Sequence, residues 1–247
     1  MGYAALSDLK TREVHDWLWM LFLPPSAILL VFRLLLRPEL IAFSTISIVA
    51  AVCISLSLSY VGLFGGADFK AFACLGLALP THPFLSKTPL PSANPLFPIM
   101  VFYNMYLLST CTLLYCLARN MHWKYKRRSE LFGNPMETSP LRRFLALLTG
   151  YKTSFADLQT RSYLYPMEQV IQNNGIHRKL KFFVNVEENR RLGIESLGKF
   201  LSDSERDEVW VTPGIPLLLF AFLALLMSSF AGDVLFWIVS IVMSAIL

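Results

Sequence analysis

The sequence predicts an α-helical polytopic membrane protein with about six transmembrane helices, the first incomplete, and a small α/β cytoplasmic module inserted before the last long span. Three observations point to this class. Of 247 residues, 55% are hydrophobic and only 16% are charged, whereas an ordinary soluble domain carries about 25% charged residues. Several uncharged stretches are long enough to cross a bilayer. The net positive charge is concentrated in one polar segment, residues 119–208.

Uncharged stretches mark the predicted spans. The clearest is 40–64, whose 25 residues exceed the roughly 20 that a helix needs to cross the hydrocarbon core. Residues 17–32 form a shorter span with an expected kink at Pro24-Pro25. Further spans are predicted at 71–80, if Asp68 and Thr81 lie near the two interfaces, at 97–118, and at 209–232, with Pro213 and Pro216 in the first turn of its helix.

Both ends of the chain differ from these full spans. Only seven residues precede Asp8, so the first helix is expected to be incomplete. Residues 234–247 are too short for a clear span and predict a short final helix or a re-entrant segment. Asp233 is expected at an interface, because a charge in the hydrocarbon is costly. The chain thus divides into membrane helices over 1–118, a basic module over 119–208 and a C-terminal membrane region over 209–247.

The module at 119–208 fixes the predicted orientation. It holds 16 of the 22 Lys and Arg residues and 11 of the 17 Asp and Glu residues, which accounts for the whole net charge of +5. A cluster of basic residues directly follows the predicted span at 97–118. By the positive-inside rule this places the C-terminal end of that span in the cytoplasm, and we expect the cluster to face anionic lipid headgroups. Short strands are predicted at 179–186 and 209–212. The cluster consists of Arg119, Lys124, Lys126, Arg127 and Arg128.

Counting spans backwards from this cluster brings two distant carboxylates to one membrane face. The helix at 97–118 enters from outside, so Asp68, after Gly65-Gly66-Ala67, lies at the cytoplasmic face. Residues 8–16, with Asp8, lie on the same side. Arg33 and Arg37 fall outside, against the positive-inside rule.

The residues alone leave two interpretations of the aspartates. Asp68 follows two glycines and precedes an apolar helix, so it is a candidate N-cap. Asp8 can likewise cap a helix or pair with Lys10 or Arg12. In the second interpretation Asp8 and Asp68 form a functional pair, which is the default hypothesis for acids at membrane depth.

Three motifs stand out in the sequence. The first is Asp8-Leu9-Lys10-Thr11-Arg12-Glu13-Val14 followed by Trp17. The second is Gly65-Gly66-Ala67-Asp68-Phe69-Lys70. The third is Trp210-Val211-Thr212-Pro213-Gly214-Ile215-Pro216. These motifs resemble those of the archaeal preflagellin peptidases, members of the type IV prepilin peptidase group of GxGD-type intramembrane aspartyl proteases, and the third is similar to the start of that family's C-terminal helix. The resemblance covers most of the membrane part and the position of the module.

The resemblance implies that Asp8 and Asp68 are the catalytic pair of an aspartic endopeptidase that uses no metal or cofactor. Two adjacent carboxylates cannot both ionise cheaply, so one holds a proton and the other is charged. The charged group takes a proton from water while the acid polarises the scissile carbonyl. Gly65 and Gly66 would then allow a break before the helix and the close approach of an extended substrate.

The resemblance also implies the substrate. The family removes short basic leader peptides from preflagellins and related pilin-like precursors at the cytoplasmic face of the archaeal cell membrane. Glu13 and Asp16 suit such a leader electrostatically, with solvated interface charge as the alternative. Lys70 either biases which aspartate is charged or snorkels to the interface. The sequence lacks the CxxC pairs of bacterial relatives, so methyl transfer is not implied.

Other functions fit the sequence less well. The four histidines and four cysteines lack metal-ligand spacing, no glycine-rich phosphate loop is present, and the arginine pairs lack the aromatic pattern of a nucleic-acid site. A proton-coupled transporter, a scaffold for the module and a presenilin- or signal-peptide-peptidase-like protease are alternatives. The last expects a Pro-Ala-Leu element where this chain has Pro213-Gly214-Ile215-Pro216. The sequence does not predict the oligomeric state.

Overall fold

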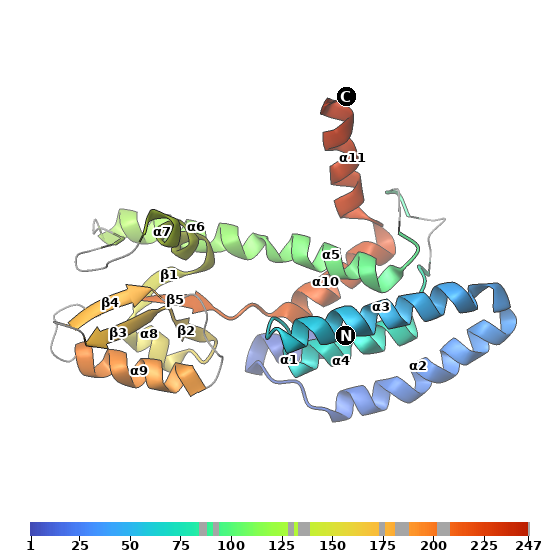
Figure 1. Cartoon of the computed structure of the whole chain (residues 1–247), viewed down its shortest axis with the longest axis horizontal. Coiled ribbons are helices and arrows are strands. Elements are labelled where there is room, and N and C mark those ends of the chain that lie inside the picture. The colour runs from blue at the N-terminus through green and yellow to red at the C-terminus, as the bar shows by residue number, and fades with distance from the viewer. Residues whose placement is uncertain are drawn as a thin grey trace. The chain divides into compact units, whose positions relative to one another are not determined.

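A computed structural model describes residues 1–83, 88–90, 94–127, 131–132, 139–172, 176–180, 188–201 and 208–246 (Figure 1). These residues are mostly helical and form two compact units. The membrane unit comprises Met1–Ser109 with Pro216–Leu247, and the module comprises Thr110–Ile215. Each unit is described below on its own.

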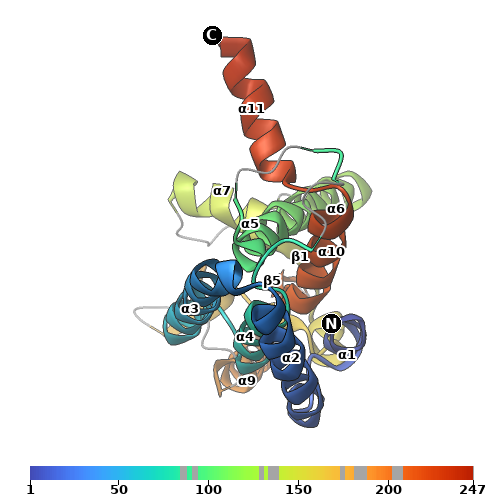
Figure 2. The same ribbon diagram turned by 90° about the vertical axis from the view of Figure 1, so that its right-hand side faces the viewer.

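The membrane unit is built from helices. They are α1 (Gly2–Thr11), α2 (Trp17–Leu36), the 3₁₀ turn η1 (Pro38–Leu40), α3 (Ile41–Tyr60), α4 (Gly66–Ala78), α5 (Phe97–Ser109), α10 (Leu217–Phe230) and α11 (Val234–Ile246). The core lies where α4, α5 and α10 meet, with Phe72, Phe97, Met100 and Ala221 buried. α11 projects away from the other helices of this unit (Figures 1 and 2).

Three helices in the described residues are long and apolar enough to cross a membrane: Trp17–Leu36, Pro38–Tyr60 and Phe97–Lys126. A fourth span results if α10 and α11, bent by 67°, are counted as one. By contrast, the 13 residues of α4 extend only about 20 Å at about 1.5 Å per residue, less than the roughly 30 Å hydrocarbon core. The chain is thus a membrane protein, and the count of about six spans stays a prediction.

The segment after Glu208 differs from the helix predicted to begin there. β5 occupies Glu208–Pro213, and α10 starts only at Leu217. Pro213 therefore ends a strand instead of starting a helix. The physical reason is that the buried β-branched and aromatic residues Val209, Trp210 and Val211 suit a strand covered on both faces, while a proline has no N–H with which to continue the ladder.

Asp233 is enclosed by protein, with only 1% of its surface exposed. Its Oδ1 accepts the N–H of Phe236 at 2.9 Å, and its Oδ2 accepts the hydroxyl of Tyr103. These bonds satisfy the carboxylate at the start of α11, where a negative charge is favoured by the helix dipole. Residues 234–246 are helical, which agrees with either a short final helix or a helical re-entrant segment.

The module is a small sheet packed by helices. β1 (Tyr151–Ser154), β5 and β2 (Leu164–Pro166) form an antiparallel sheet in the order β1-β5-β2, with Tyr151 opposite Val211. β3 (Glu168–Gln172) and β4 (Ile176–Leu180) form a separate hairpin. The helices are α6 (Cys111–Arg127), α7 (Pro140–Thr149), α8 (Phe155–Thr160) and α9 (Glu188–Leu201).

The two strands predicted inside the module have different outcomes. The strand at 209–212 is confirmed by β5. The strand predicted at 179–186 is present at its start as the end of β4, and residues 181–187 lie outside the described residues. Asn120 connects α6 to the end of α7. Its amide donates hydrogen bonds to the carbonyls of Leu147 and Gly150 at 3.1 and 2.8 Å.

Candidate active site

Asp68 lies in the first turn of α4. It is the third residue of the helix, and its Oδ2 accepts the N–H of Gly65 at 2.9 Å. A carboxylate in this position satisfies a backbone donor that has no partner within the helix and is favoured by the helix dipole. Asp68 is therefore not the N-cap itself, although it does contribute to capping α4.

The two glycines before Asp68 do not have backbone angles that require glycine. Gly65 has φ −75° and ψ 166°, an extended conformation that any residue can adopt. Its significance is spatial, because a Cβ there would lie 3.3 Å from Asp68 Oδ2. A Cβ on Gly66 would meet nothing within 4 Å. In the turn between α3 and α4 the left-handed conformation is adopted by Gly62, with φ +81°.

An aromatic cluster holds the turn before α4. The ring of Phe64 stacks on Phe72 of α4 at 5.6 Å between centroids, and Phe102 of α5 contacts both rings at 6.1 and 5.6 Å. Phe64 is only 4% exposed. Since Phe64 directly precedes Gly65, this cluster fixes where α4 begins and hence where the Asp68 carboxyl lies.

Asp8 lies in the last turn of α1 and is bonded to another helix. Its Oδ2 accepts the N–H of Leu218, in the first turn of α10, at 3.1 Å. Asp8 thus caps α10 from a distance of 210 residues along the chain. Leu218 was not anticipated as part of the site, although the Pro216 that precedes α10 pointed to a helix start there.

Buried side chains of α1, α4 and α10 meet in one cluster. Ala4 of α1, Ala71 of α4 and Leu218 of α10 are buried in one cluster. Ala4 precedes Asp8 by one helical turn and Ala71 follows Asp68 by one turn, so each alanine shares a helix face with its aspartate. The two half-buried carboxyl groups therefore lie at the same end of the membrane unit.

The electrostatics connect the two aspartates. Burial raises the pKa of Asp68 from 3.8 to about 6; the Gly65 N–H opposes this rise and the charge of Asp8 adds to it. Burial also raises the pKa of Asp8, opposed by the Arg12 charge and the Leu218 N–H. In the described residues no hydrogen bond joins the two carboxyl groups, and each uses only its Oδ2. Each Oδ1 is left for water or substrate.

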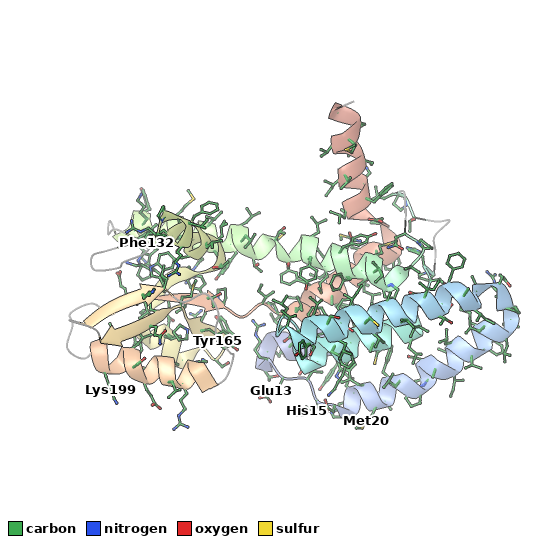
Figure 3. All side chains as sticks on the ribbon, viewed as in Figure 1. Glu13, His15, Met20, Phe132, Tyr165 and Lys199 are labelled. Atoms are coloured by element: carbon green, nitrogen blue, oxygen red, sulfur yellow. The ribbon has the colours of Figure 1, made fainter. Side chains whose placement is uncertain are left out.

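The other residues singled out from the sequence lie on α4 and on the connection between α1 and α2. Lys70 Nζ binds Asp16 Oδ1 at 2.6 Å, so these two predicted site residues form an ion pair with each other. Glu13 is exposed on the connection between α1 and α2, where His15 also lies (Figure 3). Within the described part of the chain, no three His, Cys, Asp or Glu residues are placed to hold a metal ion.

Two family models match this chain. Residues 1–117 match the model of the type IV leader peptidase family, and residues 142–234 match the model of the archaeal peptidase A24 C-terminus, type II. Together the two matches cover most of the chain.

Three similar proteins are called preflagellin peptidases. The protein from Methanocaldococcus jannaschii is 25% identical over 243 residues, which cover 93% of this chain and 89% of the relative. That from Methanococcus voltae is 25% identical, covering 93% and 91%, and that from Methanococcus maripaludis is 27% identical, covering 93% and 90%. The chain belongs to the type IV leader peptidase family.

Proposed function

We propose that this chain is a membrane-embedded aspartic endopeptidase that removes the short basic leader peptide of preflagellin and related type IV pilin-like precursors. Cleavage takes place at the cytoplasmic face of an archaeal cell membrane. The observation that carries the proposal is that two half-buried carboxyl groups, Asp8 and Asp68, lie at one end of the membrane unit, within the segment that matches the leader peptidases. The substrate class follows from the relatives' name.

The surroundings of the two carboxyl groups support different roles for them. Asp68 has a pKa of about 6 and is the group that keeps a proton, so it is the acid. Both aspartates accept an N–H at a helix N-terminus, but Asp8 also lies near the positive charge of Arg12, which favours a carboxylate. Asp8 is therefore the base. Because the two carboxyl groups interact, the pKa values seen in a titration are properties of the pair and not of either residue alone.

The proposed reaction needs only water and the two acids. Protonated Asp68 donates a hydrogen bond to the scissile carbonyl oxygen, and Asp8 removes a proton from the attacking water. The resulting tetrahedral intermediate collapses when the C–N bond breaks and the proton on Asp8 passes to the leaving amine. In this mechanism α1 and α4 approach further when substrate binds, so that both carboxyl groups reach the same water and scissile bond.

The open space around the glycines supports the entry of an extended chain. Nothing lies within 4 Å of the position of a Cβ on Gly66, so a substrate backbone can pass directly over the start of α4. Glu13 and Asp16 lie at the exposed edge of this region and attract the basic leader, while Lys70 holds Asp16 in place until the leader arrives. Basic residues after the membrane helix, including Lys124 and Lys126, face lipid headgroups.

Cleavage of a purified precursor tests the proposal. The full chain, reconstituted in liposomes with a preflagellin carrying its leader, is expected to release the leader by one cut just before the hydrophobic helix. A chelator of divalent cations is expected to leave the rate unchanged. The products are identified by mass spectrometry. An intact precursor, or a rate abolished by the chelator and restored by metal, would contradict the proposal.

The activity is expected to fall as the pH rises through about 6. Because kcat/KM reports the free enzyme, the relevant pKa is that of Asp68 before substrate binds, about 6. Above this pH Asp68 loses the proton that it must donate. The raised pKa also makes the free energy of unfolding depend on pH. Because Asp68 binds its proton more tightly in the folded chain than in the unfolded chain, its contribution to stability is complete below about pH 4 and is lost as the pH rises through about 6. A kcat/KM that increases between pH 6 and 8 would rule out Asp68 as the acid.

Asp16→Asn is expected to affect substrate binding more than stability. The Asp16–Lys70 pair is exposed, with 64% and 39% of the two side chains accessible, so its loss lowers the free energy of unfolding by at most about 1 kcal/mol. The KM for a basic leader is expected to rise severalfold. A leader whose Lys and Arg are replaced by Gln provides the control, since wild type and variant should then have equal KM. Equal KM values with the basic leader would show that Asp16 does not contact it.

A further inference from the structure

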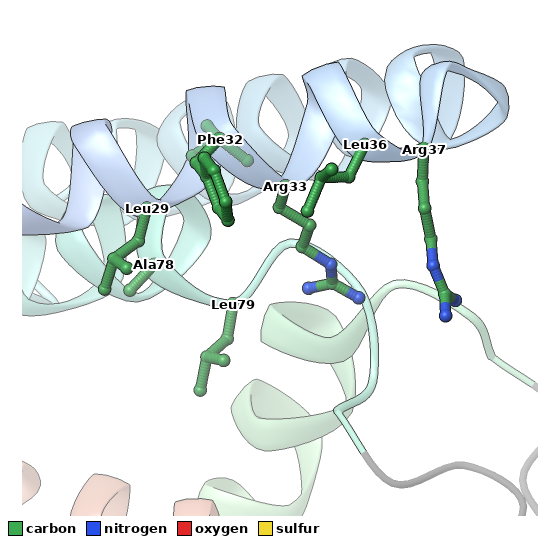
Figure 4. Close-up of a pocket in the computed structure, with 8 residues that line it drawn as sticks. Leu29, Phe32, Arg33, Leu36, Arg37, Ala78 and Leu79 are labelled. Carbon is green, nitrogen blue, oxygen red and sulfur yellow. The ribbon is translucent and has the colours of Figure 1, made fainter.

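A groove lies at the opposite end of α4 from Asp68. Its volume is about 400 Å³, and it is lined by the C-terminal part of α2 and by Leu79, just after α4 (Figure 4). Ala78 follows Asp68 by ten positions in α4, or about 15 Å along the helix. The groove is therefore separate from the candidate active site.

One wall of the groove is an exposed apolar surface. Leu29, Phe32 and Leu36 lie on one face of α2, at helical spacings of three, four and seven residues. These side chains are 66%, 61% and 67% exposed. In a helix that crosses a membrane, such a surface is in contact with lipid acyl chains.

Two arginines form the polar end of the groove. Arg33 and Arg37 are spaced by four residues and continue the face that begins at Leu29, and Figure 4 shows their guanidinium groups extending from the same side of α2. Arg33 Nη2 donates to Thr81 Oγ1 at 2.7 Å, which fixes its position. Among the described residues neither arginine forms a salt bridge, and Glu39, two residues after Arg37, pairs with neither.

The level of these arginines in the membrane is set by α2. The helix has 20 residues and is about 30 Å long, the thickness of the hydrocarbon core. Arg33 lies one turn before its C-terminus and Arg37 directly after it, so both guanidinium groups reach the headgroup region. A guanidinium keeps its charge and offers several N–H donors that match the oxygens of a phosphate.

We propose that this groove binds one anionic phospholipid, with its phosphate between Arg33 and Arg37 and an acyl chain along Leu29, Phe32 and Leu36. The lipid supplies the negative charge that the described protein residues do not. Such a site also explains why two arginines occur at the end of the membrane unit where the sequence analysis expected few. This binding site is independent of the proposed peptidase activity.

Native mass spectrometry of the full chain in detergent tests the proposal. Phosphatidylglycerol is titrated into wild type and into the double variant Arg33→Gln, Arg37→Gln. The Kd for the first bound lipid is expected to rise about thirtyfold, since each cation at an anionic surface contributes about fivefold. The matched control is Arg142→Gln, Lys179→Gln, which removes the same charge from exposed side chains of the module and is expected to leave the Kd of the first lipid unchanged.

Two further ligands identify what is bound. Phosphatidylcholine is expected to bind at least tenfold more weakly than phosphatidylglycerol, and inorganic phosphate at equal concentration is expected not to compete. Equal Kd values for wild type and the double arginine variant, equal binding of the two lipids, or displacement by phosphate would each overturn the proposal. If the double variant does not fold, Arg37→Gln alone changes an exposed residue and should raise the Kd about fivefold.

Discussion

Replacing Asp68 by asparagine is expected to lower the single-turnover rate of leader removal by about 10²- to 10⁴-fold, the usual contribution of a general acid or base. Asparagine cannot release a proton as a carboxylic acid does, yet its amide oxygen can still accept the N–H of Gly65 that Asp68 Oδ2 accepts at 2.9 Å. The start of α4 is therefore preserved while the acid is lost. Asp8→Asn is expected to have an effect of the same size, because its oxygen can likewise accept the Leu218 N–H.

Rates are measured on a membrane-embedded precursor with enzyme in excess, so that product release does not limit them. The matched control is Glu39→Gln, an exposed carboxylate of the same unit at the other end of α2. It should cleave at the wild-type rate. If a correctly inserted Asp68→Asn variant retained half of the wild-type rate, Asp68 would serve only to cap α4.

The second large effect is expected in the module, where Gly150→Ala should lower the free energy of unfolding by about 3 kcal/mol. A Cβ at Gly150 would lie 2.2 Å from Met167 Sδ and 2.6 Å from the carbonyl oxygen of Val211. The methionine can move, but Val211 is paired with Tyr151 in the sheet and its carbonyl cannot. The measurement is pulse proteolysis of the full chain in urea, with the module's fragments assigned by mass spectrometry.

Gly198→Ala gives a control of opposite sign in the same module. Gly198 lies inside α9, and its nearest neighbour would be Phe155 at 3.4 Å, an ordinary contact. Alanine is favoured over glycine in a helix interior by about 1 kcal/mol, so this variant should be slightly more stable than wild type. Equal stabilities of the Gly150→Ala chain and wild type would show that the strands around Val211 adjust freely.

The sequence was most informative where a single physical requirement dominates. Long uncharged stretches predicted the helices α2 and α3, since only a helix satisfies its own backbone in a bilayer. The alternation at Val209 and Val211 predicted β5. What it did not predict was where β5 ends and α10 begins, because Pro213 is compatible with the end of a strand as well as with the start of a helix.

Contacts between distant segments were the part of the site that the sequence could not predict. The motifs around Asp8 and Asp68 selected the two acids, but nothing local to Asp8 indicates that its partner is the N–H of Leu218. The pairing of Lys70 with Asp16 also depends on how α2 packs against α4. Such contacts depend on helix packing, which is set by side-chain shape at positions such as Ala4 and Ala71.

The most direct test of the account is whether the two aspartates act as one site. The single-turnover rate of the double variant Asp8→Asn, Asp68→Asn is compared with those of the two single variants, all in liposomes and corrected for inserted protein. Residues that act as a unit are strongly non-additive, so the three rates are expected to be equal within a few fold. A double variant slower than wild type by the product of the two single losses would contradict the account, because the aspartates would then contribute independently.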